Sequence, residues 1–133
     1  MRNIRVKELM TPDPVLISPD ATLQEAAKEM AVFDCGFLPV MRKDGVLGTI
    51  TDRDITIRAV SKGLDPRKEK VLSYMTHDCF SCNENDYLED AAEKMREHKV
   101  SRLIVKNHKG EVVGVLSFGG ILRQDADAKE VSN

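Results

Sequence analysis

Apolar residues near the start of the chain predict a strand followed by an amphipathic helix. Residues 15–17 are a short apolar run between two prolines, which is typical of a buried strand. The apolar positions that follow have the i, i+3, i+4, i+7 spacing of a helix with one buried face: Leu23, Ala26, Ala27 and Met30. Thr22 and Glu25 form a capping-box pair at the start of this helix, and Gly36 is its expected end.

Two further strands and a second helix are expected after this helix. Residues 37–41 and 46–50 read as strands joined by a hairpin turn, because Asp44-Gly45 lies between them. Pro39 lacks a backbone N–H, so its strand should lie at an edge or pair on one side only. A helix is predicted over residues 52–62, ended by Gly63.

The same pattern occurs a second time in the chain. Met10-Thr11 reappears as Met75-Thr76, 65 residues later. The apolar and glycine positions between these two points match at nearly constant register, which indicates duplication of one structural unit. The second copy predicts strands near Phe80 and over residues 103–105 and 112–116, with helices over residues 88–98 and 119–124.

The duplication predicts the domain organisation. We expect a first repeat over residues 8–64, a linker over 65–72, a second repeat over 73–126 and a tail over 127–133. The linker is short and charged, so the two β-α-β-β-α repeats should pack together, sheet to sheet, around a shared apolar interior. The expected fold class is therefore α/β, of the α+β kind.

Composition restricts the function classes. The chain has 133 residues and a net charge of −2, which favours neither nucleic acid nor an anionic membrane as a partner. No apolar run is long enough to span a bilayer, and the first residues do not read as a secretory signal. Three cysteines in such a chain favour a cytoplasmic location.

Three motifs in a fixed order carry a resemblance to a known family. They are Met10-Thr11-Pro12, the segment over residues 36–40 (GFLPV) and the segment over residues 48–55 (GTITDRDI). The chain resembles a tandem pair of cystathionine-β-synthase (CBS) repeats, known as a Bateman module. The resemblance implies a regulatory module with up to two clefts between its repeats. It also implies an adenosine ligand (AMP, ADP, ATP or S-adenosylmethionine), a homodimer, no catalytic activity and no required cofactor.

Thr51 and Asp54 are the principal candidates for ligand contact. They stand where a strand ends and a helix begins. A carboxylate there can accept both hydrogen bonds of a ribose diol, and a nearby hydroxyl suits ribose or phosphate oxygens. The pair matches the Ser/Thr-x-x-Asp pattern with which CBS repeats contact ribose and phosphate. The alternative is a helix N-cap that needs no ligand, and the two roles are compatible.

The resemblance completes this main cleft with residues from both repeats. Thr49, Ile50 and the backbone around Phe80 are expected to face the adenine base of the ligand. Ser101 and Arg102 are expected near its phosphates. A guanidinium matches phosphate bidentately. The alternatives are a core position for Phe80 and a solvated or ion-paired Arg102.

A second, weaker cleft is expected from the second repeat's closing motif. The resemblance combines Ser117 and Gly120 with Val15, Gly36 and Phe37. Gly120 stands where the first repeat has Asp54, so the ribose carboxylate is missing. This cleft should bind weakly, bind another ligand or stay empty.

Two other functions remain open from the residues alone. The regulatory module would act on an unknown regulated protein, whereas the first alternative is a structural or interaction dimer whose clefts are vestigial. The other is a thiol-responsive or metal-responsive protein that uses Cys79 and Cys82. Residues three apart on a strand point to opposite faces, which disfavours the second of these, and no metal ligand set is predicted.

Overall fold

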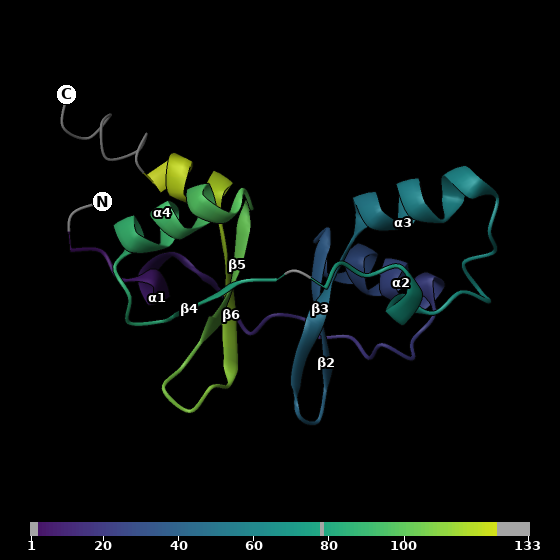
Figure 1. Cartoon of the computed structure of the whole chain (residues 1–133), viewed down its shortest axis with the longest axis horizontal. Helices are drawn as coiled ribbons and strands as arrows, with labels where there is room; N and C mark the ends of the chain where they lie inside the picture. The colour runs from purple at the N-terminus through teal and green to yellow at the C-terminus, as the bar shows by residue number, and fades with distance from the viewer. Residues whose placement is uncertain (1–2, 78, 125–133) are drawn as a thin grey trace. The chain divides into compact units, whose positions relative to one another are not determined.

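The structure is a computed structural model that describes residues 3–77 and 79–124 (Figure 1). It contains both helices and strands, so the predicted α/β class is confirmed. The elements in chain order are α1 (Val6–Leu9), β1 (Thr11–Pro12), α2 (Leu23–Phe33), β2 (Phe37–Arg42), β3 (Gly45–Thr51), α3 (Asp52–Arg58), the 3₁₀ helices η1 (Val60–Lys62) and η2 (Val71–Ser73), β4 (Ser81–Asn83), α4 (Leu88–His98), β5 (Arg102–Lys106) and β6 (Val112–Ser117). Residues 118–124 are also helical. The tail expected over 127–133 lies outside the described residues.

The chain forms two compact units. The first-repeat unit is Val15–Cys79, and the second-repeat unit comprises the described residues of Met1–Pro14 and Phe80–Asn133. The first-repeat unit holds the antiparallel β2–β3 hairpin with α2 and α3, and the second-repeat unit holds a four-stranded sheet in the order β1-β6-β5-β4 with α4 (Figure 1).

Each unit is completed by the opening segment of the other repeat. Thr76 pairs with Thr49 of β3, with N–H···O distances of 2.9 and 2.8 Å in the two directions. Thr11, which corresponds to Thr76 in the duplication, pairs with Val115 of β6 in the second-repeat unit. The compact units of the structure therefore do not coincide with the sequence repeats, because each unit includes the opening segment of the other repeat.

We call these two opening segments the exchanged segments, because each one packs in the unit of the other repeat. They begin earlier than the Met-Thr motif. Val6 and Val71 are both fully buried, and both lie at the start of a short helix. The linker is also bonded to α2, because the N–H groups of Leu23 and Gln24 donate to the carbonyls of Glu69 and Pro66 at 2.9 and 3.1 Å. These bonds satisfy donors that a helix start leaves without an intrahelical partner.

The strand expected over residues 15–17 is reduced to a single bridge between Ile17 and Val40. Pro39 explains the reduction. In the second-repeat unit the N–H of Ile104 donates to the carbonyl of Phe80 at 3.0 Å, and β4 follows. Pro39 occupies the position of Ile104 in the first repeat and has no N–H to donate, so the parallel pairing cannot extend toward Val15.

The predicted start of α2 is confirmed, but its predicted end and one buried position are wrong. Thr22 and Glu25 form the expected reciprocal capping box. The helix ends at Asp34, which adopts φ +50°, rather than at Gly36. Asp and Asn tolerate this left-handed conformation better than most residues. Ala27 is exposed, whereas its counterpart Ala92 in α4 is buried.

The second predicted helix is divided into two elements. The α-helical part, α3, ends at Arg58, and η1 follows it up to the expected stop at Gly63, which adopts φ +72°. The predicted β2–β3 turn is confirmed, with Gly45 at φ +134°.

Each unit has an apolar core of its own. In the first-repeat unit, buried residues of α2, β2, β3 and α3 meet the exchanged segment. In the second-repeat unit, buried residues of α4, β5 and β6 meet α1. The largest fully buried side chains are Leu23, Leu38, Ile50, Leu88, Met95, Leu103, Ile104, Leu116, Ile121, Val6, Val40 and Val71.

Candidate ligand site at the start of α3

Thr51 and Asp54 close a capping box at the junction of β3 and α3. The N–H of Asp54 donates to Thr51 Oγ1 at 3.0 Å, and the N–H of Thr51 donates to Asp54 Oδ2 at 3.0 Å. The capping interpretation is thus confirmed. It uses only one carboxylate oxygen, so the cap leaves Asp54 Oδ1 for other partners.

The other carboxylate oxygen has two protein neighbours. Arg58 Nε lies 3.7 Å from Asp54 Oδ1, and Thr76 Oγ1 donates to the same oxygen at 3.5 Å. The Asp54 side chain is 13% exposed, so it is held in place and can still be reached from solvent. A shallow depression of about 210 Å³ lies here, lined by Arg53, Asp54, Ile57 and Arg58.

Thr49 and Ile50 belong to the buried part of β3. Thr49 is 7% exposed and uses its backbone N–H and carbonyl in the bridge to Thr76. Ile50 is fully buried and contributes its side chain to the core. Any ligand contact from Ile50 would therefore involve its backbone.

Phe80, Ser101 and Arg102 all belong to the second-repeat unit. The carbonyl of Ser101 accepts a bond from the N–H of Phe118 at 2.8 Å, and Arg102 is exposed at the start of β5. The half-buried Phe80 ring stacks on His98, with ring centroids 3.9 Å apart and planes 13° apart. Phe80 thus also packs at the edge of its unit's core.

The residues of the second predicted cleft also divide between the two units. The N–H of Gly120 donates to Ser117 Oγ at 3.0 Å, so half of the capping box survives without a carboxylate. In the first-repeat unit Phe37 pairs with Thr51, and the carbonyl of Gly36 accepts from the N–H of Asp52 at 3.0 Å. Val15 packs against the core of that unit.

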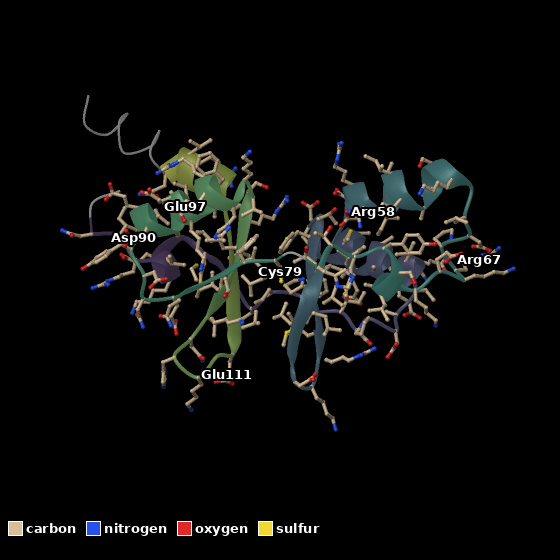
Figure 2. The ribbon with its side chains drawn as sticks, viewed as in Figure 1. Arg58, Arg67, Cys79, Asp90, Glu97 and Glu111 are labelled. Atoms are coloured by element: carbon tan, nitrogen blue, oxygen red, sulfur yellow. The ribbon has the colours of Figure 1, made fainter. Side chains whose placement is uncertain are left out.

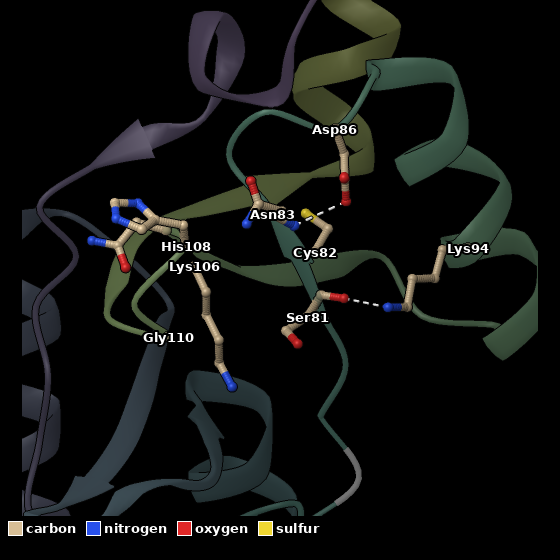
Figure 3. A pocket seen from close by; sticks show the side chains of 9 residues that line it. Ser81, Cys82, Asn83, Asp86, Lys94, Lys106, His108 and Gly110 are labelled. Carbon is tan, nitrogen blue, oxygen red and sulfur yellow. Dashed lines mark hydrogen bonds between the residues drawn. The ribbon is translucent and has the colours of Figure 1, made fainter.

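Cys82 is a buried thiol with a raised pKa. It is 8% exposed, and burial, with the nearby carboxylate of Asp86, raises the pKa of the Cys82 thiol to about 11. It lies in a polar depression of about 380 Å³, where Lys94 donates to the carbonyl of Ser81 and the N–H of Asn83 donates to Asp86 (Figure 3).

Within residues 3–77 and 79–124, no group of three His, Cys, Asp or Glu side chains could hold a metal ion. None of the described helices is long and apolar enough to cross a bilayer.

Comparison with known proteins establishes the family. Residues 6–60 and 71–127 match the family model of the CBS domain. The chain belongs to the CBS domain family. The two matched ranges begin at Val6 and Val71, the buried valines that open the two exchanged segments.

The CBS pair is similar to stand-alone proteins of the family. CBS domain-containing protein YhcV of Bacillus subtilis is 34% identical over 116 residues, which make up 87% of this chain and 81% of YhcV. The CBS domain protein PAE2072 from Pyrobaculum aerophilum, solved as a complex with AMP, has a TM-score of 0.77 and 32% identity, with 88% and 89% of the two chains covered.

A third relative has a structure that contains metal. Hypoxic response protein 1 of Mycobacterium tuberculosis is 29% identical over 119 residues, which are 88% of this chain and 82% of that protein. A crystal structure of Hypoxic Response Protein I with two coordinated zinc ions has a TM-score of 0.76 and 27% identity over 90% of this chain and 98% of that chain.

Sequence reasoning missed two neighbours of Asp54. Arg58 follows Asp54 by four residues, a spacing that brings opposite charges together on one helix face and could have identified it. Thr76 is 22 residues away, and only the folded chain brings its hydroxyl to Asp54.

Proposed function

We propose that this CBS pair is a regulatory module that binds an adenosine nucleotide at Thr51 and Asp54 and catalyses no reaction. The observation that supports it most is the partly exposed Asp54 carboxylate, fixed by the cap at Oδ2 while Oδ1 lies beside a shallow depression. A fixed carboxylate can accept the two hydroxyl donors of a ribose in charge-assisted hydrogen bonds. The similarity to PAE2072, solved with AMP, supports an adenosine compound as the ligand.

The proposed site includes Thr49, Ile50, Phe80, Ser101 and Arg102 as further ligand contacts. The phosphates would meet the guanidinium of Arg102, since Arg is always charged and binds phosphate bidentately. The second site, at Ser117 and Gly120 with Val15, Gly36 and Phe37, would bind more weakly because it has no ribose carboxylate. We therefore expect one strong site per chain.

Signalling would follow from differential binding. A ligand that binds one arrangement of the molecule better than another shifts the population toward it, and a partner protein or a second copy responds to the change. We expect the module to act as a homodimer in the cytoplasm, where its three cysteines stay reduced.

Calorimetry with AMP, ATP, S-adenosylmethionine and NADH tests the proposal. We expect at least one adenosine compound to bind with about one ligand per chain, and Asp54→Ala to weaken binding by a factor of about 10 or more, because a hydrogen bond to a charged group is lost. Asp52→Ala is the matched control, since Asp52 is an exposed carboxylate in the same helical turn. If none of the four compounds binds, the proposed function is wrong; if Asp54→Ala binds normally, the site is wrong.

A ligand-free interaction dimer is the second candidate. Four large apolar side chains of the first-repeat unit are exposed at the end of α2 and along α3 and η1: Val32 (75%), Phe33 (56%), Ile57 (46%) and Val60 (57%). Exposed apolar surface is a feature of association sites. Light scattering of Phe33→Asp tests this role, and a dimer that persists unchanged would exclude Phe33 from the interface.

A thiol-responsive or metal-responsive function has less support. The high pKa of the buried Cys82 thiol disfavours its thiolate, the form that reacts and binds metal. The zinc of Hypoxic Response Protein I keeps this alternative worth testing. Stoichiometric zinc in the purified protein, lost in Cys79→Ser, would establish it.

A further inference from the structure

Arg58 joins the candidate ligand site to a distant part of the chain. Its Nη1 donates to the carbonyls of Tyr74 and Met75 at 3.2 and 3.3 Å, while its Nε lies 3.7 Å from Asp54 Oδ1. The side chain extends from α3 (Figure 2) and is 48% exposed. One guanidinium therefore contacts the carboxylate of the site and two backbone carbonyls of the segment that opens the second repeat.

The segment Tyr74–Thr76, which we call the connector, is held from the other side as well. Thr76 forms a two-bond bridge with Thr49, and its hydroxyl donates to Asp54. The close approach depends on Gly48, because a Cβ atom there would lie 2.3 Å from the carbonyl oxygen of Thr76. Asp54, Arg58 and the connector thus form one bonded cluster inside the first-repeat unit.

The acceptor capacity of Asp54 makes this cluster relevant to binding. A carboxylate has about four lone-pair positions. One receives the N–H of Thr51, and Oδ1 faces both Thr76 and Arg58. A ribose diol needs two acceptor positions. The orientation of Asp54, and the bonds that its neighbours make to it, decide whether two acceptor positions are available.

We propose that Arg58 is a positioning residue of the ribose site. Its guanidinium holds Asp54 in the orientation that accepts a diol, and the same guanidinium bonds to the connector. Arg suits this role because its five donors have fixed directions and its charge is permanent. The inference rests on the proposed function for the ligand site itself.

The second repeat offers an internal comparison. Gly120 stands at the place of Asp54, and Gln124, four residues later, stands at the place of Arg58. The carboxylate and the guanidinium are thus both replaced in the repeat where the weak site is expected.

Discrimination between AMP and 2′-deoxy-AMP tests the positioning role. If Asp54 accepts the diol, the wild-type protein should prefer AMP by a factor of about 10 or more, because one charge-assisted hydrogen bond is lost with the 2′-hydroxyl. Arg58→Met should reduce this preference to about 2-fold, and Arg58→Lys should restore it in part. Arg67→Met is the control, because Arg67 is an exposed arginine that pairs with Asp65 and does not line the depression.

The outcomes separate the two proposals. A loss of affinity for both nucleotides by the same factor in Arg58→Met would refute the positioning role, because a structural defect does not distinguish a 2′-hydroxyl. Normal discrimination in Asp54→Ala would instead refute the ribose site. If discrimination disappears in Asp54→Ala and persists in Arg58→Met, only the inference about Arg58 fails.

Hydrogen exchange without ligand tests the connector contact separately. Arg58→Met should speed exchange of the Thr49 and Thr76 amides, which bond each other's carbonyls, while Arg67→Met should leave both rates unchanged. Unchanged rates in Arg58→Met would refute the connector part of the inference, whether or not any nucleotide binds.

Discussion

Replacing Gly48 with alanine should separate the connector from β3. The added Cβ would lie 2.3 Å from the carbonyl oxygen of Thr76, whereas ordinary contacts begin at 3.4 Å, so the two backbones must separate by about 1 Å. That movement stretches both bonds between Thr49 and Thr76, now 2.9 and 2.8 Å, beyond hydrogen-bonding range.

The magnitude follows from these contacts. Two lost hydrogen bonds contribute about 2 kcal/mol, and overpacking adds about 1–3 kcal/mol. The reduced entropy of the unfolded chain offsets about 0.5–1 kcal/mol. Gly48→Ala should therefore lower the free energy of unfolding by about 2–4 kcal/mol, a large share of the stability of a small protein.

Urea denaturation followed by circular dichroism measures this loss, with two other glycines as controls. Gly114→Ala, the equivalent change, should cost less, because its nearest contact is the flexible side chain of Met10 at 2.5 Å and the backbone carbonyl oxygen of Thr11 lies at 2.9 Å rather than 2.3 Å. Among the described residues, Gly119→Ala meets only Arg123, at 3.5 Å, and it should be neutral or stabilising. Wild-type stability in Gly48→Ala, or a greater loss in Gly114→Ala, would refute the reasoning.

Three further predictions concern single side chains. Gly120→Asp should complete the cap at Ser117, stabilise the protein by about 0.5–1 kcal/mol and raise the number of bound nucleotides per chain, as thermal unfolding and calorimetry would show. Cys82 should resist alkylation at pH 8 in the folded protein; because its pKa of about 11 exceeds that of an unfolded thiol, stability should fall as pH rises from about 9 to 11. The hydrogen bond from Tyr74 to Glu69 raises the pKa of the Tyr74 phenol, so an absorbance titration should show one late tyrosine that Tyr74→Phe removes.

The predictions that the structure confirms depend on residues close together in the sequence. The Thr22 capping box, the turn at Gly45 and the cap at Thr51 each involve neighbours within a few positions, where residue type nearly dictates backbone conformation. The duplication needed no structure, because matching positions recur at a constant interval. The asymmetry between Asp54 and Gly120 follows directly from that alignment of the repeats.

The contacts that the sequence left open join residues far apart in the chain. No local rule reveals that Thr76 reaches Asp54, or that Arg58 bonds the carbonyls of Tyr74 and Met75. Pro39 has a further long-range effect, because its missing N–H shortens the strand expected over residues 15–17, more than twenty residues earlier. The ligand contacts assigned to residues of both units stay predictions. Sequence determined the local elements and the carboxylate at position 54, whereas only tertiary structure decided which partners hold that carboxylate, because packing and long-range hydrogen bonds are satisfied only in the folded chain.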